Sequence, residues 1–330
     1  MSTGVDITVT RSPTRQGVLR AAEAVAAILP PTPLLPVEIR RQQVWVKAEC
    51  LQPIGVFKIR GAWHRLNDMT PEERARGVVG VSSGNHAQGV AWAARRLGIR
   101  AAIVMPRDAP RVKLERVREL GAEIVLYDRA REDRDAISRA LAEERGAVLV
   151  HAFGDAWVIE GQGSAGVELT AQLETLAGGG PTRIVTPCGG GGLAAGLALA
   201  CPDAEIVTVE PEGWDDVAHS LASGVIERVG PNSPPTACDA LQTRATWPIN
   251  FAVLKDRAVG LAVSEAEVRA AQHFAFAHLR LVLEPGGAAA LAAALSGKVM
   301  LDGRTAIMLT GGNTDAASYA AMLAGVQPSA

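Results

Sequence analysis

Short apolar segments alternate with longer amphipathic segments along most of this chain of 330 residues. Residues 78–81, Val-Val-Gly-Val, carry no polar side chain, and residues 87–97 repeat apolar side chains with helical spacing. Strands without polar alternation are buried on both faces, as in parallel sheets covered by helices. The pattern therefore predicts an α/β fold with mostly parallel sheets flanked by helices. The same pattern predicts further strands at 44–49, 101–105, 124–127, 147–150, 183–186, 205–209 and 305–309, and further helices at 17–29, 62–69, 110–120, 131–144, 158–176, 192–199, 264–279 and 286–295.

The alternation pauses near residue 155 and then resumes, which suggests two α/β units. The chain is long enough for two domains, and with 48% hydrophobic residues it can bury a sizeable core. We therefore expect a small domain of residues 61–157 and a large domain of residues 1–60 and 158–330. Residues 228–248 are rich in Pro, Ser and Thr and are expected to form a long loop.

Charge and cysteine usage exclude several classes of protein. The net charge of -2, with both signs spread along the chain, offers no electrostatic basis for binding nucleic acid or an anionic membrane. No uninterrupted apolar run is long enough to span a bilayer. The four cysteines lack zinc-site spacing, and the polar N-terminus lacks the apolar core of a signal peptide. We expect reduced thiols and a cytoplasmic location.

The segment 55–62, Gly-Val-Phe-Lys-Ile-Arg-Gly-Ala, contains one lysine, Lys58, directly after an aromatic residue, Phe57. A lysine held in apolar surroundings loses hydration, so its pKa falls and its amine becomes available for Schiff-base chemistry. On these eight residues alone, a surface lysine at the start of a helix is the more ordinary interpretation.

Five small or polar residues, Ser82, Ser83, Gly84, Asn85 and His86, lie between a predicted strand and a predicted helix. Ligands of open parallel sheets bind at the carboxyl ends of the strands. Hydroxyl, amide and helix N-terminal N–H groups would converge there on a small anion such as an amino-acid carboxylate. The alternative is an ordinary capped turn, for which one serine or asparagine suffices.

Four consecutive glycines, Gly189, Gly190, Gly191 and Gly192, also join a strand to a helix. Without Cβ atoms, their backbone N–H groups can surround a phosphate at the helix N-terminus. No Gly-Lys-Ser/Thr follows, so the segment is not a Walker loop, and a phosphomonoester fits better than a nucleotide. The alternative is a flexible turn.

Two further loops follow predicted strands. Glu210 and Asp216, with an intervening carbonyl, have the oxygen ligands that a hard cation prefers, although a solvated acidic loop capping a helix near Asp215 is an alternative. In the segment 310–313, Thr-Gly-Gly-Asn, the hydroxyl and the glycine backbone can approach the edge of a planar ring closely. Taken alone, this segment is better explained by a plain turn.

Taken together, these stretches resemble the pyridoxal-phosphate (PLP) enzymes of the second fold type, in the branch of serine/threonine dehydratases and serine racemases. The resemblance covers nearly the whole chain and implies a two-domain fold similar to the tryptophan synthase β subunit, with the large domain binding PLP. It rests on short stretches of sequence, which begin at Thr32, Phe57, Ser82, Gly161, Gly189, Thr236, Glu284 and Gly311.

The resemblance implies roles for the residues near the cofactor. Lys58 would carry PLP as a Schiff base, and Phe57 would lie against the ring. Asn85 would bond the ring hydroxyl, the glycines 189–192 would hold the phosphate, and Thr310 would meet the pyridine nitrogen. Residues 82–86 would bind the substrate carboxylate.

The resemblance also implies a divalent cation and a homodimer. Glu210, the carbonyl of Trp214 and Asp216 match the cation site of the racemase-like branch, for Mg²⁺ or Ca²⁺, with Mn²⁺ as a further possibility. Two positions depart from the family pattern: Val56 stands where serine is usual, and Thr310 where serine or cysteine is usual.

The expected activity is that of an ammonia-lyase (dehydratase), which eliminates water from a small β-hydroxy-α-amino acid such as L-threonine, L-serine or 3-hydroxyaspartate. A racemase is the second interpretation, with Ser83 as the acid/base opposite Lys58. A non-catalytic PLP or amino-acid binding protein is the third. A second substrate carboxylate requires an arginine in the pocket, and the sequence places neither Arg131 nor Arg244 there.

Overall fold

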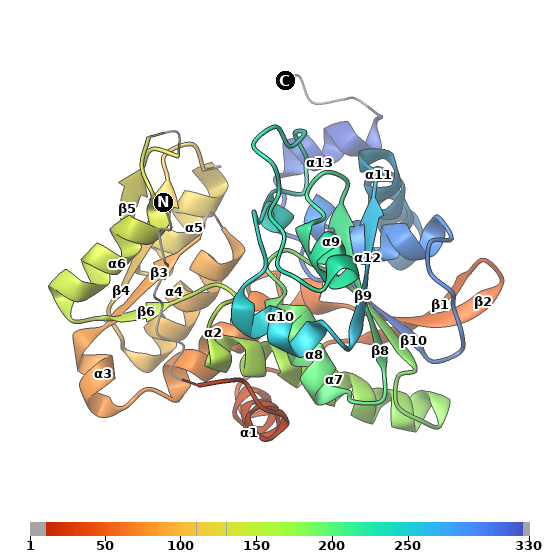
Figure 1. The fold of residues 1–330 in the computed structure, drawn as a ribbon, viewed down its shortest axis with the longest axis horizontal. Coiled ribbons are helices and arrows are strands. Elements are labelled where there is room, and N and C mark those ends of the chain that lie inside the picture. The colour runs from red at the N-terminus through yellow and green to blue at the C-terminus, as the bar shows by residue number, and fades with distance from the viewer. Residues whose placement is uncertain (1–10, 83, 110, 130, 326–330) are drawn as a thin grey trace.

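The computed structural model describes residues 11–82, 84–109, 111–129 and 131–325 and contains two sheets with helices on both faces (Figure 1). In the described residues, the larger sheet has the order β1 (Leu34–Ile39), β2 (Gln42–Lys47), β10 (Thr305–Met308), β7 (Arg183–Pro187), β8 (Glu205–Pro211) and β9 (Ala258–Val263). The smaller sheet has the order β5 (Glu123–Tyr127), β4 (Ala101–Pro106), β3 (Val78–Val81) and β6 (Val148–Val150). All of these pairings are parallel except that between β1 and β2. The predicted α/β fold is confirmed.

Burial in the central strands explains why their sequences lack polar alternation. Ile184 and Val185 are neighbours in β7, so their side chains leave opposite faces of the sheet. Both are fully buried, each in a different apolar cluster. A strand that is covered on both sides therefore reads as a continuous apolar run.

Helices cover both sheets. Their bounds are α1 (Arg15–Ala26), α2 (Lys58–Asn67), α3 (Pro71–Arg76), α4 (Asn85–Leu97), α5 (Arg111–Glu119), α6 (Arg134–Arg145), α7 (Ala156–Ala177), α8 (Gly192–Ala200), α9 (Asp216–Ser223), α10 (Pro248–Leu254), α11 (Glu265–Phe274), α12 (Pro285–Leu295) and α13 (Ala316–Leu323). Within the described residues, no helix combines the length and the apolar character needed to cross a bilayer.

The long helix α7 packs against α1, α2 and α8 and runs along the lower side of the view in Figure 1. Its glycines weaken the helical pattern in the sequence, yet the helix is continuous over 22 residues. A Cβ atom on Gly161 would stand 2.6 Å from the Cα of Gly61 in α2, and one on Gly163 would stand 2.7 Å from the carbonyl oxygen of Gly196 in α8. The glycines are therefore explained by close helix packing, which offsets their low helix propensity.

Several boundaries differ from the sequence-based expectation. Helix α2 begins at Lys58 rather than at residue 62, because the chain turns directly from the loop after β2 into the helix. The edge strand β9 was not predicted, since Gly260 interrupts its apolar run. Helix α11 ends at Phe274 and continues as a π-helical turn up to Arg280, which adopts φ = 60°.

Candidate active site

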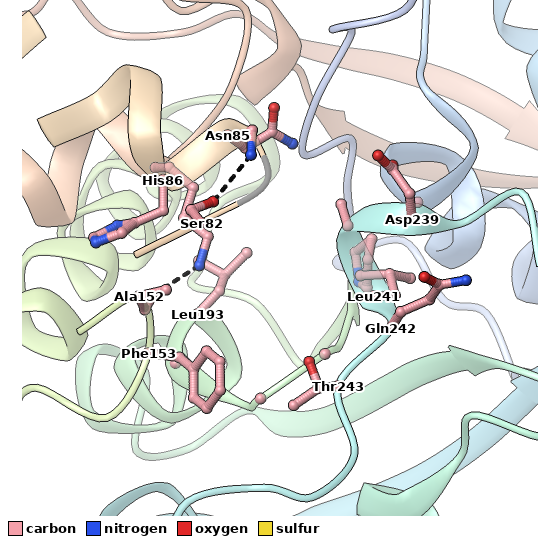
Figure 2. A pocket seen from close by; sticks show the side chains of 18 of the residues that line it. Ser82, Asn85, His86, Ala152, Phe153, Leu193, Asp239, Leu241, Gln242 and Thr243 are labelled. Atoms are coloured by element: carbon pink, nitrogen blue, oxygen red, sulfur yellow. Dashed lines mark hydrogen bonds between the residues drawn. The ribbon is translucent and has the colours of Figure 1, made fainter. Parts of the chain in front are cut away.

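A central pocket lies where the carboxyl ends of strands from the two sheets face each other. It is lined by residues that follow β3, β6, β7 and β10, together with the start of α2. In Figure 2, Ser82 and His86 stand on one side of this pocket, and Asp239 and Gln242 stand on the other. The structure brings together these predicted residues: Phe57, Lys58, Ser82, Gly84, Asn85, His86, Gly189, Gly190, Gly191, Gly192 and Thr310. Ser83 lies outside the described residues.

Lys58 is the first residue of α2, and its ammonium group has been removed from water on most sides. Its Nζ donates a hydrogen bond to the carbonyl oxygen of Ala152 at 2.8 Å and lies 5.2 Å from the ring centroid of Phe57. Burial disfavours the charged form and lowers the pKa of Lys58 to about 8. A substantial fraction of this amine is therefore neutral near physiological pH.

The loop of residues 82–86 leads from β3 into α4. The hydroxyl of Ser82 accepts a hydrogen bond from the backbone N–H of Gly84 at 3.1 Å. A Cβ atom on Gly84 would stand 2.8 Å from the stem of Lys113, so only glycine fits there without displacing that side chain. His86 is buried and its Nε2 bonds the carbonyl of Val150 at 3.0 Å. Burial, and secondarily the charge of Lys58, lower the pKa of His86 to about 3, so this ring is neutral.

Asn85 belongs to a buried chain of hydrogen bonds. Its Nδ2 donates to Oε1 of Glu284 at 2.6 Å, and its Oδ1 accepts from Nδ2 of Asn313 at 2.9 Å. Arg116 in turn donates to Oδ1 of Asn313 at 2.8 Å. Burial, followed by the charge of Asp239, raises the pKa of Glu284 to about 7. The network fixes the side-chain amide of Asn85 at the pocket wall.

The glycines 189–192 connect β7 to α8 at the edge of the pocket. Gly191 has φ = 89°, a conformation that favours glycine. A Cβ atom on Gly190 would stand 2.2 Å from the ring of Phe153, which follows β6. Among the described residues, no acceptor is hydrogen-bonded to the backbone N–H groups of Gly189, Gly190 or Gly192. These free donors at the start of a helix form a cradle for an anion.

Phe57 and Thr310 are held side by side at the pocket. The backbone N–H of Phe57 donates to the carbonyl of Thr310 at 3.1 Å, and Val56 forms an isolated bridge with Gly311. The hydroxyl of Thr310 is bonded to no other group in the described part of the chain. Val56 is fully buried, so a hydroxyl at that position would lie in the core beside this bridge.

The acidic loop after β8 does not line the central pocket. Both oxygens of Glu210 accept backbone N–H groups at the start of α9, from Val217 at 3.1 Å and Ala218 at 2.8 Å. Asp216 is buried, and its carboxylate oxygens have no hydrogen-bond partner among the described residues. The indole of Trp214 donates to the carbonyl of Pro234. No cluster of three or more acidic, histidine or cysteine side chains suited to a metal occurs in the described residues.

The structure adds pocket residues that sequence reasoning did not single out. Lys113 pairs with Asp239 across the pocket, and His151 and Arg134 line it from the smaller sheet. Asp239 lies in the stretch that starts at Thr236, whereas Lys113, His151 and Arg134 belong to no recognisable motif. Their only sequence signal was position, since His151 directly follows a predicted strand.

Comparison with known proteins agrees with this geometry. A family model described as "Pyridoxal-phosphate dependent enzyme" matches residues 25–311. The L-threo-3-hydroxyaspartate ammonia-lyase of Pseudomonas sp is 40% identical over 292 residues, covering 86% of this chain and 88% of the relative. The serine racemase of Schizosaccharomyces pombe is 34% identical, covering 94% and 97%.

Solved structures show the same fold. The crystal structure of a threonine deaminase from T.th. superposes with a TM-score of 0.84 at 40% identity and covers 92% of this chain and 99% of that one. The family model and these relatives span most of the chain, including the lysine, the glycine cradle and the loop of residues 82–86. The chain therefore belongs to the family of pyridoxal-phosphate-dependent enzymes.

Proposed function

We propose that the protein is a PLP-dependent ammonia-lyase that eliminates water from a small β-hydroxy-α-amino acid and yields a 2-oxo acid and ammonium. One observation carries the proposal. The same pocket is lined by an amine with a lowered pKa, by the free N–H donors of the glycine cradle, and by the loop of residues 82–86, which is suited to a small anion. The relatives named as a hydroxyaspartate ammonia-lyase and a threonine deaminase support this reaction class.

The residues present fit the cofactor. The unpaired amides of Gly189, Gly190 and Gly192 suit its phosphate, and Lys58 suits its aldehyde. Phe57, Asn85 and Thr310 line the same pocket and would hold the ring. When bound, pyridoxal phosphate withdraws electrons from the substrate and so acidifies its α-proton.

The chain's own groups would then perform the proton transfers. Lys58, whose amine is partly neutral, would accept the α-proton. The N–H groups and the hydroxyl of residues 82–86 would hold the α-carboxylate. A hydroxyl at Thr310 does not keep a pyridine nitrogen protonated as a carboxylate would, which favours rapid loss of the β-hydroxyl.

We also propose a divalent cation, Mg²⁺ or Ca²⁺ with Mn²⁺ as a further possibility, at Glu210, Asp216 and the carbonyl of Trp214. The unpaired, buried oxygens of Asp216 suit a hard cation, which would neutralise two adjacent carboxylates. Mg²⁺ should raise the Tm of the wild type and leave that of Asp216→Asn unchanged. An identical rise in both proteins would refute this site.

A racemase remains the second candidate, because serine racemases align over nearly the whole chain. Racemisation needs an acid/base on the face opposite Lys58, and Ser83 is the proposed group. In Ser83→Ala, formation of the D-amino acid should stop while elimination from the L-substrate continues. Unchanged racemisation in this variant would exclude Ser83 from that role.

The deciding experiment incubates the purified protein with PLP and Mg²⁺ against a panel of L- and D-β-hydroxy amino acids. Release of a 2-oxo acid and ammonium is expected from one or two of them. Appearance of the opposite enantiomer without release would favour the racemase. A spectral response to amino acids without any product would favour a non-catalytic binding protein.

The assembly and location are further proposals. We propose a homodimer in the cytoplasm, with a small domain of residues 61–157 and a large domain of residues 1–60 and 158–330. The separate four-stranded and six-stranded sheets support the division. Sedimentation equilibrium should give twice the chain mass, and a monomer at all concentrations would contradict the dimer.

A further inference from the structure

Two arginines reach the central pocket from the segment after β5. Arg129 and Arg134 line both this pocket and an outer cavity of about 630 Å³ that adjoins it. Arg134 is the first residue of α6, where the side chain of Asp133 caps the helix by accepting two backbone N–H groups. The cap fixes the backbone that carries Arg134, and so places its guanidinium at the junction of the two spaces.

Among the cationic side chains that line the pocket, Arg134 has the weakest ion-pair partner. Lys58 donates to a carbonyl, and Lys113 is paired with Asp239. Arg129 pairs with Asp108 at 3.3 Å. Among the described residues, the only acidic group within ion-pair distance of Arg134 is its neighbour Asp135, at 3.6 Å, and Arg134 makes no hydrogen bond. Its guanidinium is therefore available to a ligand.

His151 lines the same two spaces as this arginine and offers a neutral donor. Its Nδ1 accepts the backbone N–H of Gly154 at 2.7 Å, so the ring proton is on Nε2. The ring stacks on Trp247 at 4.7 Å and meets Phe153 edge-on at 4.6 Å. Nε2 has no partner in the described part of the chain, and His151 lines both spaces.

The protonation state of His151 is set by its surroundings. Burial is the largest cause that lowers the pKa of His151 to about 3, and the positive charges of Arg134 and Lys58 add to it. The ring therefore keeps one proton, on Nε2, throughout the neutral range. The amine of Lys58 and the guanidinium of Arg134 are thus both close enough to influence the same imidazole.

We propose that Arg134, together with Nε2–H of His151, binds a second carboxylate on the substrate, so that the preferred substrate is a β-hydroxy amino dicarboxylic acid of the 3-hydroxyaspartate type. The inference rests on the proposed ammonia-lyase function. A guanidinium fork matches a carboxylate, whereas the methyl group of threonine leaves it unpaired. Arg131 does not line the pocket, and Arg244 lines only the outer cavity.

The test compares Arg134→Gln with the matched control Arg131→Gln, an arginine three residues away with an 86% exposed side chain. Both variants are assayed for release of 2-oxo acid from L-threo-3-hydroxyaspartate and from L-threonine. In Arg134→Gln, kcat/KM for hydroxyaspartate should fall about 10- to 100-fold, the loss expected for a charge-assisted hydrogen-bonded pair, mainly through KM. Turnover of threonine by Arg134→Gln should fall far less than that of hydroxyaspartate, and both activities of the control Arg131→Gln should be unchanged. Arg134→Lys should restore part of the loss.

Two outcomes would overturn the proposal. Equal hydroxyaspartate turnover in Arg134→Gln and wild type would remove Arg134 from substrate selection. Loss of both activities in this variant, with the control intact, would show a structural or general catalytic role instead.

A binding measurement separates this inference from the lyase proposal. Calorimetry on the PLP-loaded protein should show tighter binding of L-aspartate than of L-alanine, and the difference should vanish in Arg134→Gln. If no amino acid is turned over, the lyase proposal fails. The difference in affinity between L-aspartate and L-alanine still shows whether Arg134 binds a second carboxylate. Equal affinities in the wild type would overturn the subsite.

Discussion

Burial determines the chemistry of the individual groups around the pocket. Lys58, Glu284 and the two histidines all have a pKa displaced towards the neutral form, and desolvation is the largest cause in each case. A pocket closed on most sides by protein therefore holds a partly neutral amine, neutral imidazoles and a partly protonated carboxyl group. Such shifts are typical of functional sites.

The lowered pKa of Lys58 predicts how the cofactor-free protein captures PLP. Only a neutral amine attacks the aldehyde, so the capture rate should rise with pH and level off above about 8. A surface lysine would continue to gain rate up to about 10.5. Visible absorbance of the bound cofactor measures the rate.

Lys58→Ala should not develop the visible absorbance of the bound cofactor, and it should lose turnover. Wild-type turnover in that variant would remove Lys58 from the mechanism. A plateau only near the ordinary lysine pKa in the wild type would show that its amine is hydrated.

Glu284 predicts a pH dependence of stability. Its native pKa of about 7 lies above the ordinary value of 4.5, so the native state binds more protons between these values. The free energy of unfolding should therefore fall as pH rises through that window, by up to about 3 kcal/mol. Glu284→Gln keeps the acceptor for Asn85 and removes the titration.

This pH dependence is measured by urea unfolding of the cofactor-free wild type and of Glu284→Gln, each at acidic and at mildly alkaline pH. The variant should gain stability relative to the wild type at the higher pH. A constant difference between the two proteins would place the native pKa of Glu284 near its ordinary value.

At the scale of elements, α2 carries Lys58 and is anchored by buried charge. Arg60, two residues after Lys58, donates to both oxygens of Glu49 at 2.7 Å, and Glu168 accepts from the same guanidinium. Glu49 also accepts the hydroxyl of Thr32 at 2.7 Å. The network ties the start of α2 to the segments around β1 and β2 and to α7.

Removing one partner of this buried pair should cost more than removing one partner of an exposed pair. Glu49→Gln removes the fully buried charge partner of Arg60 and leaves only the partly exposed Glu168, so the free energy of unfolding should fall by about 3 kcal/mol or more. Glu123→Gln breaks the exposed, two-bond pair with Arg145 and should cost less than about 1 kcal/mol. Chemical unfolding measures both, and equal losses would mean that water reaches the Glu49–Arg60 pair.

At the scale of the whole molecule, the pocket is built from two separate sheets. The loop of residues 82–86 and His151 follow strands of the smaller sheet, whereas the glycine cradle and Thr310 follow strands of the larger one. A molecule bound in the pocket therefore contacts both parts and should stabilise them together.

Loading with PLP should raise the Tm of the protein. At about 100 times Kd, a ligand that binds only the native state adds about 2.7 kcal/mol. Pyridoxal lacks the phosphate and should give a smaller rise, because the amides of the glycine cradle remain unpaired. Equal shifts from the two compounds, measured by calorimetry at the same free concentration, would argue against a phosphate site at residues 189–192.

The alternation of apolar strands and amphipathic helices was enough to predict the α/β class, because burial on both faces imposes a local pattern. Motif residues next to strand ends were likewise predictable, since Lys58, the glycine cradle and Thr310 each lie in short contiguous stretches. Predictions failed where tertiary contacts override local preference. The glycines of α7 are an example, because they are explained only by the helices that pack against them.

The sequence by itself determined the fold class and placed the lysine and the glycine cradle at strand and helix ends, because these depend on the order of residues along a few strands and turns. Only the tertiary structure decided which distant side chains share the pocket. Arg134 and His151 belong to no motif, and Glu284 meets Asn85 across 199 residues of sequence. Their proximity follows from how the two sheets and their helices pack together, a relation between segments that no local pattern encodes.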